Sequence, residues 1–409
     1  MADELAVWLY GERVATIDRK RGRPRLAYTE QALGRYDLGT PLLSLSLPLA
    51  TERYTQGVTR PFLDGLLPEG EPRKAIARDL GLRADDTYGL IEALGRDCAG
   101  ALVIQPLEDP RPPVPTTTSA ERLSPEELEA LVRDLRSAPL GAGGRVRVSL
   151  AGVQEKLLLT RMPDGSWGRP VDGTPSTHIL KPEIAAYPHT VENEALCMRT
   201  AKHLGLEVAA VETTEIAGRK LIVVERYDRA VDGSGAVERI HQEDFCQATG
   251  TPPDTKYEED GGPSLRRVAG IVQSVATPGS LERLAQAIAL NVVLGNGDAH
   301  AKNLSLLHLA SGGLTLTPLY DLMCTLHYGD DRLAMYVDSV QRTDRVAAPR
   351  IVNEIVRWGM SPGRAAEIVS DILDRAPAAI AAAREETGGV PDDLVATIEQ
   401  RLAQLRASG

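Results

Sequence analysis

The segment Leu294-Gly-Asn-Gly-Asp298-Ala-His-Ala-Lys-Asn303 decides the fold of this chain. It follows an apolar run, Leu281 to Leu294, which predicts a helix that ends at the glycines. Asp298 and Asn303 are five residues apart, and a second isolated acid, Asp321, lies further along. An acid, an amide and a later acid in this order are typical of phosphoryl-transfer loops, but a loop rich in Gly, Asn and Asp is also an ordinary turn. The rest of the chain has to decide between these interpretations.

Length and composition indicate a globular protein. The 409 residues are enough for two or three domains with a large buried core. Apolar residues make up 43% and charged residues 25%, which is ordinary for a soluble protein. The net charge of −11 argues against direct, nonspecific binding to nucleic acid or anionic lipid, without excluding a local basic patch such as Arg19 to Arg25.

The cysteines and the N-terminus predict a cytoplasmic location. Cys98, Cys197, Cys246 and Cys324 are far apart and form no C-x-x-C pair, so we expect small buried side chains in a reducing compartment rather than disulfides or a zinc site. The N-terminus lacks the basic region of a signal peptide, and no apolar run approaches the roughly 18 residues that cross a bilayer. We therefore expect no membrane partner.

The first 107 residues predict a β-rich subdomain that includes helices. Strands are expected at 5–10, 14–17, 26–28 and 42–49, where the last segment alternates Leu and Ser. A Pro-rich run in residues 108–123 predicts a linker. Ser124-Pro-Glu-Glu127 then forms a capping box for a helix to about Leu135.

Residues 124–228 predict a second β-rich region. A Gly-containing turn near Gly152 is followed by Lys156, a later strand ends at Lys181, and the next helix carries Glu194. A strand lysine followed by a helix glutamate is how a kinase N-lobe holds the phosphates of ATP, although most such residues are simply solvated. The turn does not match G-x-x-x-x-G-K-[ST], which excludes a P-loop NTPase.

Residues 229–409 predict a mainly helical region that contains the Asp298 loop. The acidic Gly/Pro-rich segment 252–263 is expected to be a solvated, mobile loop, and residues 346–409 are expected to be helical with breaks at 361–363 and 388–389. The complete order of elements predicts an α+β, bilobal, protein-kinase-like fold with a β-rich N-terminal subdomain and a mainly helical C-lobe.

Seven segments together resemble the HipA family of serine/threonine kinase toxins from bacterial toxin–antitoxin modules. They are Phe62–Gly70, Gly95–Gly100, Ser149–Lys156, Thr177–Pro182, Glu225–Arg229, Asp298–Asn303 and Tyr320-Asp321. The resemblance implies ATP and Mg²⁺ as cofactors, Asp298 as the catalytic acid, and Asn303 and Asp321 as magnesium ligands. It also implies an ion pair between Glu194 and Lys181, and autophosphorylation at Ser149 that inactivates the kinase. The nucleotide-binding residues that it implies are Ala151, Gly152, Val153, Gln154, Glu155 and Lys156 in a phosphate loop, Lys181, the hinge Glu225, Arg226 and Tyr227, and His300, Lys302, Asn303, Tyr320 and Asp321.

The resemblance further implies a substrate and partners. The expected substrate is an aminoacyl-tRNA synthetase, notably glutamyl-tRNA synthetase, whose phosphorylation inhibits translation and causes growth arrest or persistence. A HipB-like helix-turn-helix antitoxin would bind the chain. Because residues 364–384 lack a dense basic cluster, operator DNA is expected to be contacted only through the antitoxin complex.

Three other interpretations stay open. A small-molecule phosphotransferase on the same fold would use the same ATP residues. A catalytically silent corepressor bound to the antitoxin is disfavoured because Lys181, Asp298, Asn303 and Asp321 are all present. A hydrolytic transition-metal site at Asp298, His300 and Asp321 is disfavoured because one histidine among carboxylates is a poor zinc ligand set.

Overall fold

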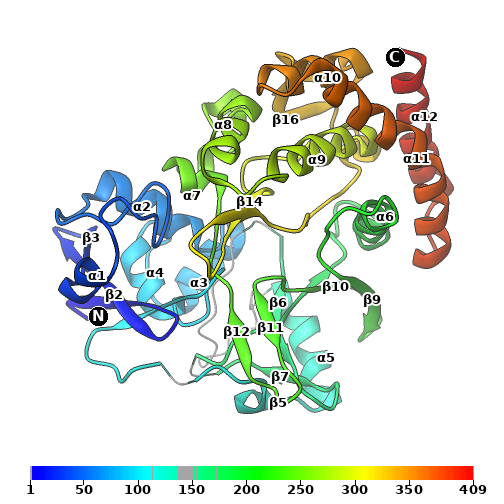
Figure 1. Cartoon of the computed structure of the whole chain (residues 1–409). Helices are drawn as coiled ribbons and strands as arrows, with labels where there is room; N and C mark the ends of the chain where they lie inside the picture. Colours follow the sequence, from blue (N-terminus) through cyan, green and yellow to red (C-terminus); the bar gives the residue numbers. More distant parts are fainter. Residues whose placement is uncertain (1, 113, 137–151, 153, 172, 409) are drawn as a thin grey trace. The chain divides into compact units, whose positions relative to one another are not determined.

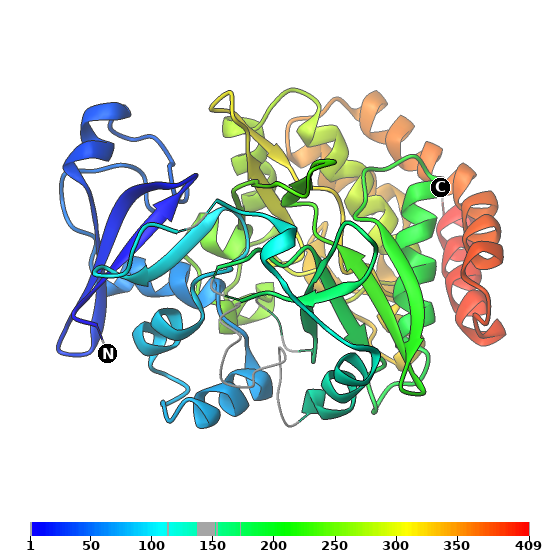
Figure 2. The same cartoon turned by 90° about the horizontal axis from the view of Figure 1, so that it is seen from below.

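The computed structural model describes residues 2–112, 114–136, 152, 154–171 and 173–408, which form two compact units (Figure 1 and Figure 2). Unit 1 comprises Met1–Pro182, Glu215–Arg219 and Glu225–Asp254. Unit 2 comprises Glu183–Thr214, Lys220–Val224 and Thr255–Gly409. Both units are discontinuous in sequence, and the predicted domain boundaries at residues 107, 123 and 228 stay predictions.

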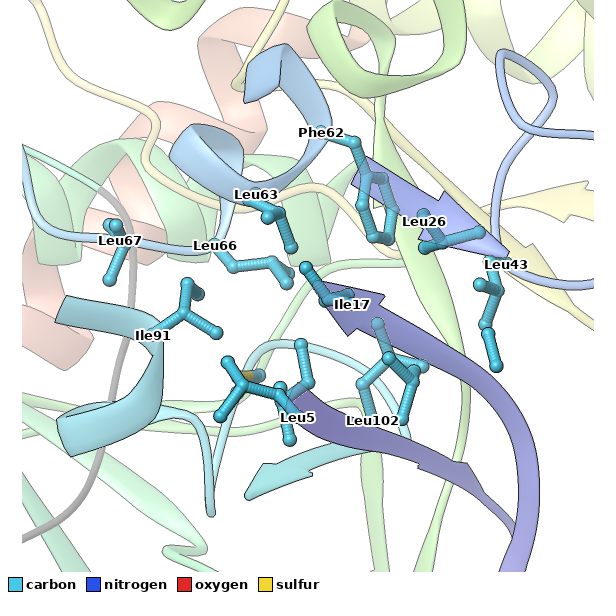
Figure 3. Close-up of a cluster of buried hydrophobic side chains, with 14 of the residues drawn as sticks. Leu5, Ile17, Leu26, Leu43, Phe62, Leu63, Leu66, Leu67, Ile91 and Leu102 are labelled. Carbon is cyan, nitrogen blue, oxygen red and sulfur yellow. The ribbon is translucent and has the colours of Figure 1, made fainter. Parts of the chain in front are cut away.

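The N-terminal part of unit 1 is a four-stranded antiparallel sheet in the order β3-β2-β1-β4, packed against helices. Its elements are β1 Glu4–Leu9, β2 Glu12–Lys20, β3 Arg23–Tyr28, α1 Glu30–Arg35, α2 Gln56–Gly65, α3 Gly70–Asp79, α4 Thr87–Leu94 and β4 Leu102–Pro106. Figure 3 shows the core, in which Phe62 and Leu63 of α2 and Ile91 of α4 face Leu5 and Ile17 of the sheet. These apolar side chains are almost fully buried, so their removal from water stabilises this part of the fold.

Residues 42–49 do not form the predicted strand. Leu43 and Leu47 are buried in the core, but the backbone between them turns, and the buried Glu243 carboxylate accepts hydrogen bonds from Ser44 Oγ at 2.5 Å and from the Leu45 N–H at 3.0 Å. The Glu243 side chain thus accepts the hydrogen bond that the Leu45 N–H would donate to a neighbouring strand in a sheet. The alternation of Leu and Ser therefore reflects a buried turn.

The remainder of unit 1 contains strands in the order β5-β7-β6-β8. Its elements are β5 Glu121–Arg122, α5 Pro125–Arg133, β6 Leu157–Arg161, β7 Trp167–Arg169, β8 His178–Pro182, β11 Arg229–Val231, β12 Val237–Arg239, β13 Gln242–Asp244 and α7 Phe245–Thr249. The predicted capping box of α5 is confirmed, since Ser124 and Glu127 each bond to the other's backbone N–H.

A buried ionic cluster joins the segment around Asp97 to the residues that follow β10. Asp97 pairs with Arg229 at 2.9 Å and with Arg226 and Arg239 at 3.4 Å, and Arg226 also pairs with Asp228 at 2.8 Å. All five residues are at most 6% exposed. Burial opposes ionisation of Asp97, but the arginines outweigh it and hold the pKa of this carboxyl below its usual value.

Asp97→Asn is expected to lower the free energy of unfolding at pH 7 by about 3–5 kcal/mol, because three buried guanidinium groups lose a counter-charge. Since the native-state pKa of Asp97 is depressed, the difference between wild type and variant should narrow as the pH falls below 3.8, because the unfolded wild-type chain then takes up a proton that the folded chain binds only at lower pH. Denaturant titrations of both proteins at pH 7 and at a pH below 3.8 measure this difference in the free energy of unfolding. Glu71→Gln, which removes an exposed pair with Lys74, is the control and should change stability by less than about 1 kcal/mol.

Unit 2 is mainly helical. Its elements are α6 Thr190–His203, most of β9 Val211–Ile216 and β10 Arg219–Glu225, α8 Leu265–Val275, α9 Ser280–Leu294, β14 Ser305–His308, β15 Leu314–Leu316, β16 Arg332–Val337, β17 Val340–Arg342, α10 Ala348–Arg357, α11 Pro362–Thr387 and α12 Asp392–Ala407. Helix α11 packs against α6, α9 and α12 (Figure 1). The predicted helical tail with two breaks is confirmed.

Two further expectations concern the cysteines and the presence of membrane-spanning helices. All four cysteines are free and buried, as predicted. Within the described ranges, no helix is both long enough and apolar enough to span a lipid bilayer.

Candidate active site

The predicted catalytic loop begins where α9 ends and is closed by one hydrogen bond. Helix α9 stops at Gly295, and the Asn303 Nδ2 group then donates to the backbone carbonyl of Asp298 at 2.9 Å. Tyr320 Oη donates to the carbonyl of Lys302 at 2.8 Å, so the segment before Asp321 holds the end of the same loop. The acid and the amide predicted from their spacing therefore lie together.

Gly297 fixes the loop from its other side. Its N–H donates to Thr325 Oγ1 at 2.7 Å, and its carbonyl accepts from the Ala334 N–H of β16 at 2.7 Å. A Cβ atom at this position would lie 2.4 Å from the carbonyl oxygen of Arg332, which is backbone and cannot move aside cheaply. Only glycine allows this close approach.

The Asp298 side chain is 46% exposed, so its carboxylate is accessible to another molecule. Burial by surrounding protein atoms raises the pKa of Asp298 to about 6, and the negative charge of Asp321 raises it further. The hydroxyl of Tyr257, which donates to Asp298 Oδ1 at 2.7 Å, acts in the opposite direction and lowers this pKa. A carboxylate with a raised pKa that is still ionised at neutral pH suits a group that accepts a proton.

His300 lies beside Asp298 as a buried, neutral imidazole. It is 4% exposed, and burial lowers its pKa to about 3. Its Nε2 is 3.9 Å from Asp298 Oδ1, and its ring meets the ring of Tyr257 edge to face. Its Nδ1 is buried and has no hydrogen-bond partner among the described residues. Such an orphan atom is consistent with the predicted contact of His300 with a nucleotide, which stays a prediction.

Asp321 has a strained backbone that α6 supports. Its φ of 58° lies in the left-handed region, which is unfavourable for a residue with a side chain and is often found at functional sites. Three residues later, the backbone of Cys324 forms two hydrogen bonds with the Asn193 amide of α6, at 2.8 and 3.0 Å. The next residue of α6, Glu194, is 1% exposed. Its predicted ion pair with Lys181 stays a prediction.

The side chains of this loop fit the magnesium ion that the resemblance implies. Because Asn303 Nδ2 is used by the Asp298 carbonyl, the amide oxygen is the polar atom left for a ligand, and Asp321 supplies a carboxylate. Amide and carboxylate oxygens are the hard ligands that Mg²⁺ prefers. No group of three or more His, Cys, Asp or Glu residues suited to a metal lies together in the part of the chain that the structure describes, so phosphate and water oxygens would complete the coordination.

Unit 1 contains a place suited to an anion at the paired strands β6 and β8. The register pairs Leu157 with Leu180, and Lys156 and Lys181 are the next residues of the two segments. Both lysines are 8% exposed. Lysine ammonium groups are hydrogen-bond donors that suit phosphate oxygens, so this pair of segments could contact a phosphate chain.

Gly152 and Gln154 shape the backbone beside these lysines. Gly152 has a φ of 121°, and a Cβ atom there would lie 2.6 Å from Lys156 Nζ, so this amine sits against the bare backbone. Gln154 Nε2 donates to the carbonyl of Pro182 at 3.2 Å, while Glu155 is half-buried near Arg219. Three residues of the predicted phosphate loop and switch, namely Ser149, Ala151 and Val153, lie outside the described residues.

The predicted hinge is occupied by structural contacts of its side chains. The Arg226 guanidinium belongs to the ionic cluster of Asp97, and the Arg226 N–H donates to the Thr177 carbonyl at 2.9 Å. Tyr227 Oη hydrogen-bonds to Gln242 Oε1. Binding of adenine by Glu225, Arg226 and Tyr227 stays a prediction. It would have to use backbone groups other than the Arg226 N–H, which already donates to the Thr177 carbonyl.

The sequence interpretation missed Lys256 and Tyr257. The segment 252–263 was expected to be a solvated loop, yet Lys256 is 9% exposed and Tyr257 contacts both Asp298 and His300. The only signal was an aromatic residue in a polar loop, in a chain where aromatics make up 4%. This signal is too weak to predict a contact with residues 40 positions away.

Comparisons with known proteins agree with this geometry. Models of the HipA N-terminal domain and of the HipA-like C-terminal domain match residues 5–105 and 148–380. Y4mE of Sinorhizobium fredii is 42% identical over 80% of this chain and 78% of its own length. The serine/threonine-protein kinase toxin HipA of Shewanella oneidensis is 32% identical over 78% of this chain and 76% of its own length.

A solved structure, that of Shewanella oneidensis HipA with HipB and its operator DNA, matches 99% of this chain and 96% of its counterpart with a TM-score of 0.82 at 28% identity. The fold is thus the α+β, kinase-like fold predicted from the sequence. The chain belongs to the HipA family of serine/threonine kinase toxins.

Gly297→Ala is expected to destabilise the protein by about 1–3 kcal/mol, because the added methyl group meets the Arg332 carbonyl. Thermal or denaturant unfolding measures the loss. Gly270→Ala in the exposed part of α8 is the matched control, since no atom lies within 4 Å of its added Cβ, and it should stabilise the helix by about 0.5–1 kcal/mol. Equal stability of the two variants would contradict the proposed close approach.

Proposed function

We propose that this chain is an ATP- and Mg²⁺-dependent serine/threonine-protein kinase and the toxin of a toxin–antitoxin module. The observation that carries the proposal concerns Asp298 and Asn303. The Asp298 carboxylate is 46% exposed, and the Asn303 amide nitrogen donates to the Asp298 carbonyl, which leaves the amide oxygen for a ligand. Phosphoryl transfer needs mainly positioning and electrostatic stabilisation. Membership of a family of kinase toxins supports the same reaction.

In this proposal each group has one role. Lys156 and Lys181 bind the phosphates of ATP, Gly152 to Lys156 provide backbone around them, and residues 225–227 bind adenine. Asn303 and Asp321 hold Mg²⁺, which neutralises phosphate charge when it is bound. Asp298 orients a serine or threonine hydroxyl and accepts its proton as the oxygen bonds to phosphorus. Neutral His300 and buried Lys302 contribute to the nucleotide contacts.

The substrate and partners that we propose follow the family. The acceptor is an aminoacyl-tRNA synthetase, such as glutamyl-tRNA synthetase, whose phosphorylation inhibits translation and arrests growth in the cytoplasm. A HipB-like helix-turn-helix antitoxin binds the chain and makes the contact with operator DNA. The solved complex of Shewanella HipA with HipB and operator DNA supports the antitoxin as a partner.

We also propose that autophosphorylation of Ser149 inactivates the kinase. A phosphate adds about −2 charge, and Ser149 is seven positions before Lys156 in the sequence. Negative charge beside the lysines would compete with the phosphates of ATP for the same cations.

Asp298→Asn should abolish transfer of labelled phosphate from ATP, both to Ser149 and to a synthetase, because the amide cannot accept the proton. The measurement is incorporation of label with Mg²⁺ present, followed by comparison of the phosphoproteomes of cells that express wild type or variant. Asp371→Asn, which changes an exposed carboxylate of α11, is the control and should retain full activity. Undiminished labelling by Asp298→Asn would overturn the assignment, and transfer only to small molecules would identify a different acceptor class.

Asp321→Ala should remove the dependence of nucleotide affinity on magnesium. Calorimetric titration of ATP into wild type is expected to show tighter binding with Mg²⁺ than with EDTA, whereas the variant should bind equally weakly in both. A variant that still binds more tightly with Mg²⁺ would show that another group holds the ion.

A further inference from the structure

The loop that contains Tyr257 contacts Asp298 through a group that no sequence motif identified. Tyr257 Oη donates to Asp298 Oδ1 at 2.7 Å, a normal length for a hydrogen bond between a hydroxyl and a carboxylate. The Asp298 side chain is 46% exposed, so its other carboxylate oxygen, Oδ2, is accessible to a second donor. One oxygen is therefore held by the protein, and the second is left for another hydroxyl.

The tyrosine is itself fixed on three sides. Its ring meets the His300 ring at 5.4 Å and an angle of 80°, and the Lys256 ammonium lies 5.7 Å from its ring centroid. Its carbonyl accepts from the Gly262 N–H at 2.9 Å, which closes the loop behind it. A hydroxyl held this firmly can fix the rotamer of the carboxylate that it contacts.

One strand positions both partners of this hydrogen bond. In β16, the Ala334 N–H donates to the Gly297 carbonyl and the Tyr336 N–H donates to Glu258 Oε2, each at 2.7 Å. Gly297 precedes Asp298 and Glu258 follows Tyr257. The two loops are thus held at a defined distance by alternate residues of the same strand.

We propose that Tyr257 is a positioning residue for phosphoryl transfer: its hydroxyl holds Asp298 Oδ1 so that Oδ2 faces the hydroxyl of the protein acceptor. This inference rests on the proposed kinase function. It assigns the tyrosine an effect on the proton-accepting carboxylate and none on ATP binding.

Tyr257→Phe is the decisive variant, because it deletes the hydroxyl and keeps the ring contacts with His300 and Lys256. We expect kcat for phosphorylation of the protein acceptor to fall about 10- to 100-fold, the effect of losing a hydrogen bond to a charged group. The KM for ATP and the melting temperature should stay near the wild-type values.

Tyr328→Phe provides the matched control. It removes a hydroxyl that donates to the Pro188 carbonyl at 3.0 Å and also bonds with Asn193, so it tests a hydroxyl that contacts the support of the Asp321 segment and does not contact Asp298, and it should lower kcat far less than Tyr257→Phe. An unchanged or increased kcat for Tyr257→Phe would overturn the inference, and an increase would mean that the tyrosine competes with the acceptor. A wild type that transfers no phosphate would instead overturn the proposed function itself, so the two failures are distinguishable.

Discussion

The hydrogen bond from the Asn303 amide to the Asp298 carbonyl is the constraint on which the candidate active site depends. It requires four residues between the acid and the amide, since the loop must turn back on itself to close. It uses the amide nitrogen and so leaves the amide oxygen as the atom that could bind the proposed Mg²⁺. It also fixes the backbone from which the Asp298 carboxylate projects. One bond thus relates the proposed proton acceptor to the proposed metal ligand.

Sequence patterns were sufficient where function or folding depends on residues close together in the chain. The α5 capping box and the helical tail are both local and were predicted correctly, and the roles inferred from the Asp298–Asn303 spacing stay predictions. The strand expected at residues 42–49 was wrong because Glu243, about 200 positions away, bonds to its backbone. Period-2 hydrophobicity reports which side chains are buried, and it cannot report where the backbone N–H groups find their acceptors.

The charged residues of the predicted hinge illustrate the same limit. The family pattern assigned Arg226 to the nucleotide, and its side chain lies in a cluster of fully buried ions with Asp97 and Asp228. Tyr257 was overlooked for the opposite reason, because an isolated aromatic in an acidic loop carries no recognisable motif. The contacts of Arg226 with Asp97 and of Tyr257 with Asp298 span 129 and 41 positions, which composition and spacing do not encode.

The hydrogen bonds of β16 have a consequence for substitutions in this strand. Both loops at Asp298 are held by main-chain N–H groups of Ala334 and Tyr336, so these hydrogen bonds do not depend on the chemistry of the two side chains, although buried Ala334 leaves little room for a larger one. Proline is the exception, since it lacks the donor. Burial of Leu333, Met335 and Val337 limits the side chains of this strand, whereas its hold on the two loops depends on the backbone alone.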